Sequence, residues 1–205
     1  MRYRNLLTAF FITALALVLT AGMAFSQNLA DIDQVGNNHY ADIAQTGLYN
    51  TATVVQDHGS GGIAGIEQVG DNNQADIEQT GAAGDHEASI TQIGNDNKAF
   101  QDQRFWGSGS GYLSIEQYGN NNEAYQDRQH MNKNADGLIY QEGDDNYAFQ
   151  NQRTSFSGGG TAFASISQTG DDNWASQSQT GLGDFTSTIV QSGNHNTANV
   201  VQQGQ

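Results

Sequence analysis

The sequence has 205 residues, a formal net charge of −15, 25 glycines, and neither proline nor cysteine. A chain this acidic is a poor candidate for nucleic-acid binding, which requires cations against phosphate, and the lack of cysteine excludes disulfides and thiol chemistry. Only 14% of the residues are charged, so Asn, Gln, Ser and Thr carry most of the polarity, and the Leu-rich runs of a conventional globular core are missing from most of the chain.

The first 26 residues have the three parts of a secretory signal. Arg2 and Arg4 precede an apolar run over residues 6–21, and small residues follow. We predict a signal peptide over residues 1–26, with cleavage after Ser26; cleavage after Ala24 and an uncleaved membrane anchor are the alternatives. Its removal leaves five Lys and Arg against 22 Asp and Glu, which gives the mature chain a net charge of −17.

A fourteen-residue pattern fills most of the remaining chain. It is clearest in residues 66–79, IEQVGDNNQADIEQ, and gives the template I-x-Q-x-G-x-x-N-x-A-x-x-x-Q. Seven copies start near residues 43, 66, 90, 115, 139, 166 and 189, which predicts a repeat region over 43–205 and an N-terminal segment over 27–42. The template positions are Gln45, Gly47, Asn50, Ala52, Gln56, Gln68, Gly70, Asn73, Ala75, Gln79, Gln92, Gly94, Asn97, Ala99, Gln103, Gln117, Gly119, Asn122, Ala124, Gln141, Gly143, Asn146, Ala148, Gln152, Gln168, Gly170, Asn173, Ala175, Gln179, Gln191, Gly193, Asn196, Ala198 and Gln202.

Each copy has the pattern of a strand, a tight arc and a second strand. Side chains alternate between the two faces of a strand, and Gly and Asn tolerate the positive φ of a sharp reversal, so we expect positive φ at Gly70 and Asn73. The two Gln positions of a copy lie eleven residues apart throughout, with Arg128 in place of one Gln, whereas the step between copies varies in Gly- and Ser-rich pieces. We therefore predict an all-β fold, an amyloid-like cross-β solenoid of seven strand–arc–strand repeats.

One further arm precedes the first copy. Ile32 to Gly36 resembles the first strand of the template, and the arc that follows reaches Ala41 with His39 in the place of Asn. We therefore expect residues 32–41 to be an eighth strand and its arc.

Inward positions would form columns of like residues along such a stack. The first strands place Ile in the middle, and in-register Gln and Asn side chains can pair with their own copies on the next rung. The middle positions of the second strands hold Val54, Ile77, Gln101, Gln126, Gln150, Gln177 and Val200. Outward positions and arcs instead carry acids: Asp42, Glu67, Asp76, Glu78, Asp102, Glu116, Asp127, Asp71, Asp96, Asp144, Asp145, Asp171 and Asp172. Stacked acids repel, which predicts faster assembly as the pH falls toward the pI of about 4.2.

Four aromatic residues occupy outward positions of successive copies: Phe100, Tyr125, Tyr140 and Phe149. They are either scattered surface residues or one set that mediates lateral contacts or binds amyloid dyes.

Other classes have little support in the sequence. The composition alone is typical of a disordered chain, but disorder does not explain the constant eleven-residue step; such a chain can be disordered until it assembles. The GDDN arcs lack the GGxGxD signature of calcium-binding β-rolls. The five histidines His39, His58, His86, His130 and His195 share no ligand spacing, and we expect no metal site, no cofactor and no catalytic activity. The rows of outward Thr that ice binding needs are also missing.

The set Gln68, Gly70, Asn73, Ala75 and Gln79, with its equivalents in the other copies, resembles the curlin repeat of secreted bacterial curli amyloid. The resemblance covers about residues 31–205, and it implies export, release through an outer-membrane pore with periplasmic export factors, and polymerisation outside the cell. It implies a secreted, extracellular fibre subunit that functions in biofilm matrix, surface adhesion and cell aggregation, with itself and a homologous fibre subunit or nucleator as partners and no nucleic acid. Because the last copy, residues 189–202, is intact and has no Lys or Arg, we expect the major subunit; the minor nucleator, a calcium-stabilised β-solenoid and a capped adhesive solenoid are the alternatives.

Overall fold

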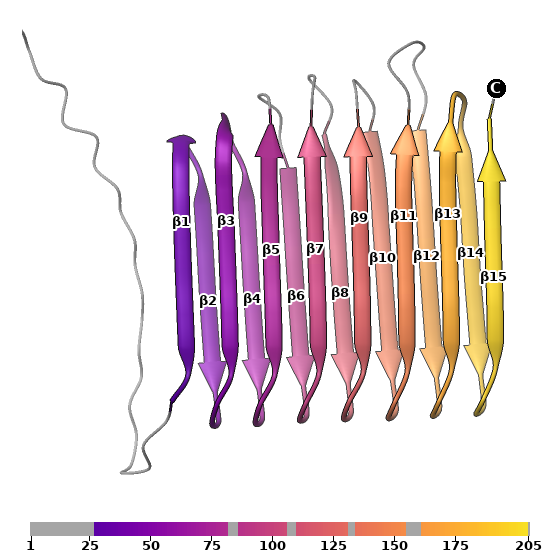
Figure 1. Cartoon of the computed structure of the whole chain (residues 1–205), viewed down its shortest axis with the longest axis horizontal. Coiled ribbons are helices and arrows are strands. Elements are labelled where there is room, and N and C mark those ends of the chain that lie inside the picture. Colours follow the sequence, from indigo (N-terminus) through magenta and orange to yellow (C-terminus); the bar gives the residue numbers. More distant parts are fainter. Residues whose placement is uncertain (1–26, 82–85, 106–109, 131–133, 155–160, 205) are drawn as a thin grey trace, which may run out of the picture.

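The computed structural model describes residues 27–81, 86–105, 110–130, 134–154 and 161–204, which form fifteen β-strands in two sheets (Figure 1). The predicted signal peptide, residues 1–26, lies outside the described residues, as does much of the Gly- and Ser-rich sequence between copies. Among the residues that are described, no helix is long and apolar enough to cross a membrane.

The strands alternate between the two sheets along the chain. The eight-stranded sheet consists of β1 (Leu29–Asn37), β3 (Thr51–Ser60), β5 (Gln74–Gly81), β7 (Lys98–Phe105), β9 (Glu123–His130), β11 (Tyr147–Thr154), β13 (Trp174–Gly181) and β15 (Thr197–Gln203). The seven-stranded sheet consists of β2 (Tyr40–Thr46), β4 (Ile63–Val69), β6 (His86–Ile93), β8 (Gly111–Tyr118), β10 (Asn134–Glu142), β12 (Thr161–Thr169) and β14 (Phe185–Ser192).

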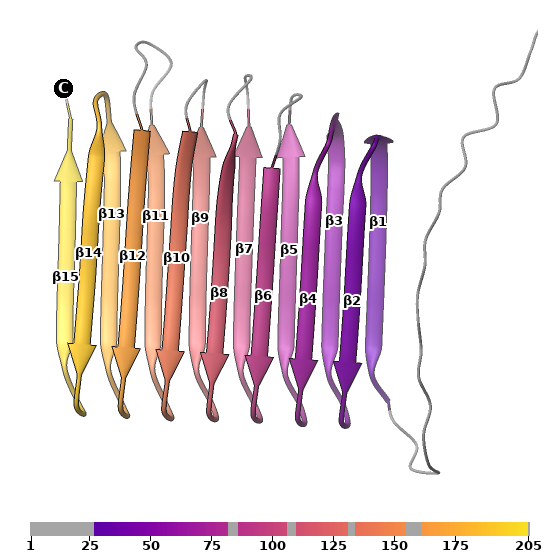
Figure 2. The same cartoon turned by 180° about the vertical axis from the view of Figure 1, so that it is seen from behind.

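Every strand pairs in parallel with the strand two places along the chain. The pairing is in register with the repeats, so Ile66 lies opposite Ile90 and Gln68 opposite Gln92. Figures 1 and 2 show the two layers from opposite sides, with β1 at one end of the stack and β15 at the other. The predicted β-solenoid is confirmed, because each copy contributes one strand to each sheet, and both sheets are parallel.

The short arcs depart from expectation at one residue. Positive φ is found at Gly70 and at Asn72, not at Asn73, and the other six copies show the same two positions relative to the template. Asn73 is instead 1% exposed and directly precedes β5. The prediction for Asn73 is wrong because Asn72 makes the reversal, which leaves Asn73 to serve another purpose.

The extra N-terminal arm is present, but it belongs to the other sheet. Strand β1 pairs with β3, which places Ile32 on Val54 and Gln34 on Gln56, so β1 is the second arm of its rung. The connection through His39 therefore lies on the side of the solenoid that carries the connections between successive copies, opposite the short arcs. His39 accepts a hydrogen bond from the Gly62 amide at 3.2 Å. Sequence spacing misplaced it because Gln34 happens to lie eleven residues before Gln45.

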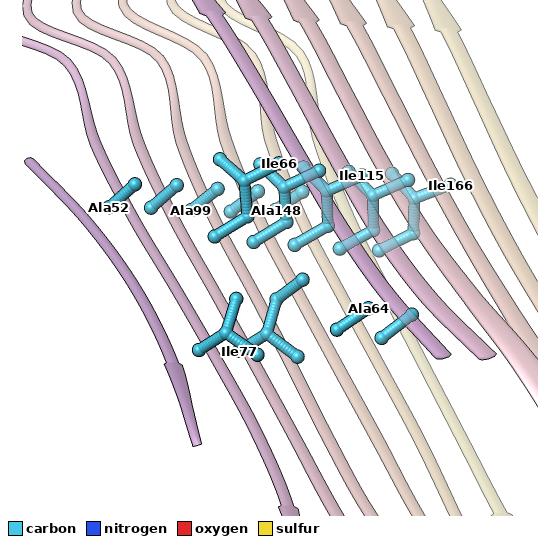
Figure 3. Close-up of a cluster of buried hydrophobic side chains, with 14 of the residues drawn as sticks. Ala52, Ala64, Ile66, Ile77, Ala99, Ile115, Ala148 and Ile166 are labelled. Atoms are coloured by element: carbon cyan, nitrogen blue, oxygen red, sulfur yellow. The ribbon is translucent and has the colours of Figure 1, made fainter. Parts of the chain in front are cut away.

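The core lies between the two sheets and consists of columns of like side chains (Figure 3). The Ile column of the first arms and the Ala column of the second arms are almost completely buried along the interior rungs. One irregularity is compensated locally: Leu113 takes the place of an Ala, and its neighbour in the next rung is Gly137, where a Cβ would come within 2.7 Å of the Leu113 Cδ2 atom. The predicted columns are thus the core of the molecule.

Candidate self-assembly surface

The first-arm glutamines form an unbroken hydrogen-bonded ladder. The Nε2 atom of each donates to the Oε1 atom of the next, from Gln45 through to Gln191, at 2.8–2.9 Å. Each Nε2 also donates to a backbone carbonyl of the opposite sheet; the partner of Gln68, for example, is the Thr51 carbonyl at 3.1 Å. A buried amide is costly unless it is paired, and this ladder pairs both ends of the amide while it ties the sheets together.

The second-arm glutamines form a similar ladder with one interruption. It runs from Gln34 to Gln103 at 2.7 Å per step, and resumes from Gln152 to Gln202 at 2.9–3.1 Å. A third ladder joins Gln101 to Gln177 at 2.9–3.2 Å, in the column where the end rungs have Val and Ile.

Arg128 occupies the gap in the second ladder. Its side chain is fully buried, and burial lowers the pKa of its guanidinium to about 9. One Nη atom donates to the Ser110 carbonyl at 2.9 Å. Its longer side chain reaches the space left by Gly111, where a Cβ would lie 2.1 Å from the guanidinium nitrogens. The sequence indicated the break in the column, but not that a cation would be buried there.

The template asparagines link the arcs of adjacent rungs. Asn122 donates from Nδ2 to the Gly143 carbonyl of the next rung at 2.7 Å, and its Oδ1 accepts the Asn146 amide at 3.0 Å. The same pattern joins most of the series from Asn50 to Asn173. Invariance of Asn across the copies therefore reflects this ladder rather than a backbone requirement.

A further ladder was missed by the sequence analysis. The residue after each arc glycine accepts the backbone N–H of its counterpart in the preceding rung, as when Asp171 accepts the Asp144 amide at 3.0 Å. The other members follow the same rule, at 2.7–3.1 Å. Its signal in the sequence is the Asp or Asn that follows Gly in six of the seven copies.

Acids and aromatics line the outer faces. Glu78, Asp102 and Asp127 lie side by side on successive strands, and Arg104 and Arg153 form ion pairs with the last two. Phe100 stacks on Tyr125 with ring centroids 5.1 Å apart, and Phe149 follows in register on β11.

Tyr140 lies apart from the other three aromatic residues. It lies on the seven-stranded sheet, against Tyr118 with ring centroids 5.6 Å apart. The four aromatics are therefore divided between the two faces, because Tyr140 comes from a first arm and the other three from second arms.

The end strands carry the same columns with less cover. Ile32 and Ile43 at one end and Val200 at the other are partly exposed, whereas Ile77 is 1% exposed. Strands β1 and β15, and likewise β2 and β14, each have a neighbour on one side only within the described residues. In that same part of the chain, no three His, Cys, Asp or Glu side chains group as a metal site would require.

Comparison with known families agrees with this geometry at the N-terminal end. Neither the search of curated proteins nor that of solved structures gave a match. Residues 27–57 match the family model described as "Curlin associated repeat". These residues contain β1, β2 and most of β3, so the stretch that forms the first rungs of the solenoid is similar to a curlin associated repeat.

Proposed function

We propose that this protein is an exported structural subunit that assembles by templated addition into extracellular curli-type amyloid fibres. Such fibres would serve biofilm matrix, surface adhesion and cell aggregation. The match of residues 27–57 to the curlin associated repeat supports the class, and the same template in all seven copies extends it along the chain.

One observation carries the proposal. Columns of Ile, Ala, Gln and Asn that are buried in the interior end on partly exposed members at both ends of the stack. An unpaired strand edge is a template for another strand, and an in-register copy would continue every column without a new kind of contact. The end of one molecule therefore fits the start of the next.

Within the fibre, we assign the chain to the major subunit. Its last copy keeps the full template, and Gln191, Asn196 and Gln202 extend three of the ladders to the final rung. A nucleating subunit with a degenerate or basic end would lack that continuity. A homologous nucleator, an outer-membrane pore and periplasmic export factors are the partners that follow from this assignment.

The test is a time course of purified Gln27–Gln205 at neutral pH, with thioflavin T fluorescence and far-UV circular dichroism, in EDTA and in added calcium. We expect a lag and a sigmoidal rise as coil turns to strand. Preformed fibres should remove the lag, and EDTA should leave the curve unchanged.

Two results would contradict the proposal. Immediate β-structure in a stable monomer would favour a capped adhesive solenoid. Folding only after calcium is added would favour a calcium-stabilised solenoid, although no three His, Cys, Asp or Glu side chains of the described residues lie close enough to hold a metal ion.

A further inference from the structure

The two sheets have unequal numbers of strands, and this raises a problem for stacking. The eight-stranded sheet supplies the outermost strand at both ends, β1 and β15. If two molecules stacked with β1 in place, the β1 of one would pair with the β15 of the other. The β2 of the first and the β14 of the second would then remain about 9.5 Å apart, twice the spacing of paired strands. A first arm that preceded β1 would need Ile, Gln and Gly at positions where the sequence has Ala21, Met23 and Phe25.

Strand β1 is of the same type as β15. Its inward residues are Ala30, Ile32 and Gln34, and Asn28 directly precedes it. These four residues occupy the columns of Asn196, Ala198, Val200 and Gln202. On the edge of β3, β1 therefore occupies the place that the β15 of a preceding molecule in the fibre would occupy.

The sequence of β15 matches β3 better than β1 does. Aligned in register, TANVVQQ of β15 and TATVVQD of β3 are identical at five of seven positions. On the outer face, Val201 of a stacked copy would lie beside Val55, where β1 now places Asp33. Identical columns are the preferred packing of in-register strands.

The outer faces of the two end rungs are also uncharged in two rows where interior rungs carry acids. In the rows where interior rungs carry Glu67, Glu78 and Glu116, the C-terminal rung has Val190 and Val201. These two valines are 73% and 58% exposed. The first complete rung has Ala44 and Val55 at the same rows. A junction between these rungs would bury apolar side chains without bringing carboxylates together.

We propose that β1 is a removable end strand that is exchanged on assembly. It leaves β3; the β15 of the preceding molecule then pairs with β3, and the β14 of that molecule pairs with β2. This inference rests on the proposed function, because it concerns the junction between stacked copies. Stacking with β1 in place and stacking with β1 displaced each form two strand pairs at the junction. Only displacement closes the gap between β2 and β14 and continues the first-arm Gln and Ile columns, and it returns conformational freedom to the released strand.

A disulfide that pins β1 to β3 tests the exchange. Asp33 and Val55 are in-register partners on the outer face, and adjacent strands lie within the Cα separation that a disulfide spans. The purified double variant Asp33→Cys/Val55→Cys, oxidised, is added to wild-type fibre seeds, and elongation is followed by thioflavin T before and after reduction. The matched control is Asn151→Cys/Ser178→Cys, in the same row, which pins β13 to β11, an interior pair that the exchange leaves intact and that lies outside the proposed junction.

We expect the oxidised β1–β3 variant to lose elongation, and reduction to restore it, while the oxidised control elongates like the wild type. Elongation of the oxidised β1–β3 variant at the control rate would overturn the exchange and leave the fibre proposal standing. Failure of the wild type and the control to elongate would contradict the proposed function itself, and the exchange with it.

A pair of substitutions gives a second test with opposite expected signs. Ile32 and Val200 occupy the same column in β1 and β15. Ile32→Asn weakens a strand that must leave, so we expect the lag to shorten, with release of β1 favoured about tenfold, or about 1.4 kcal/mol. Val200→Asn weakens a strand that must join, so we expect the lag to lengthen. If both variants lengthen the lag, β1 takes part in the junction and the exchange is wrong.

Discussion

Each short arc depends on a glycine whose carbonyl and Cα lie directly against the next arc. Gly94 has φ of +131°, and a Cβ there would come within 1.8 Å of the Gly119 carbonyl oxygen. Both the backbone conformation and the close approach of neighbouring rungs therefore exclude a side chain.

Gly94→Ala is expected to destabilise the assembled protein by more than about 2 kcal/mol, because strain at positive φ adds to a clash with rigid backbone. The measurement is the guanidinium chloride concentration at which half of the assembled protein is unfolded. Gly65→Ala is the matched control, since nothing lies within 4 Å of a Cβ built there, and its effect should stay within about 0.5 kcal/mol. Equal effects at the two sites would contradict the stacking of the arcs.

Arg128 should be a net cost to the fold. Burial lowers the pKa of its guanidinium from its ordinary value to about 9, so between these two pKa values the unfolded chain binds a proton that the folded chain does not. Stability therefore rises with pH inside that window, and the whole cost of burying the cation is present below pH 9.

Arg128→Gln is expected to stabilise the assembled protein at pH 7 by about 1 kcal/mol or more, since a Gln would join Gln103 to Gln152 and complete the ladder. The measurement is again the midpoint of unfolding in guanidinium chloride. Arg153→Gln, a change to a half-exposed arginine that pairs with Asp127, should leave it nearly unchanged. A lower midpoint for Arg128→Gln would mean that the guanidinium stabilises its site.

At the scale of the element, the Gln ladder makes each strand depend on the rungs before and after it. Gln168 accepts a hydrogen bond from Gln141 and donates to Gln191, both at 2.9 Å. Removing one member leaves a buried donor and a buried acceptor without partners on the adjacent rungs.

Gln168→Leu is therefore expected to cost about 2–4 kcal/mol and to slow elongation on wild-type seeds. Ser167→Leu, the preceding position of β12, points outward and serves as the control with little expected effect. The two variants are compared by guanidinium midpoint and by elongation rate, and a mild effect of Gln168→Leu would contradict a structural role for the ladder.

The strands and inward columns could be predicted from the sequence because period two and a constant eleven-residue step determine which residues face inward. The place of β1 could not, because spacing alone fits either sheet and only pairing with β3 decides it. Spacing also cannot distinguish Asn72 from Asn73 as the residue with positive φ, since both are Asn, a residue type that tolerates this conformation. The burial of Arg128 depends on the space beside Gly111, a contact between the two strands of one copy, which lie in different sheets.

At the scale of the whole molecule, charge opposes association at neutral pH. The row of Glu78, Asp102 and Asp127 brings carboxylates together on adjacent strands. Burial, opposed by the hydrogen bond from Arg104, raises the pKa of Asp102 above its ordinary 3.8. The folded state therefore holds this proton more tightly than the unfolded chain, so stability is gained as the pH falls through the raised pKa toward 3.8.

Fibre formation is expected to accelerate as the pH falls from 7 toward the pI of about 4.2, because both the outward rows and Asp102 lose charge. Thioflavin T time courses at constant ionic strength measure the rate. A rate that stays flat from pH 7 to pH 5 would contradict the role of the acids.

In the proposed fibre, each chain adds a stack of rungs rather than one layer. The most direct measurement is mass per unit length by scanning transmission electron microscopy of purified fibres. Seven rungs at 4.7–4.9 Å predict one chain per about 34 Å of filament, or about 38 Å if β1 stays in place as an eighth level. One chain per about 4.8 Å, as in an amyloid whose chains each lie flat in a single layer, would contradict the addition of a stack of rungs by each chain.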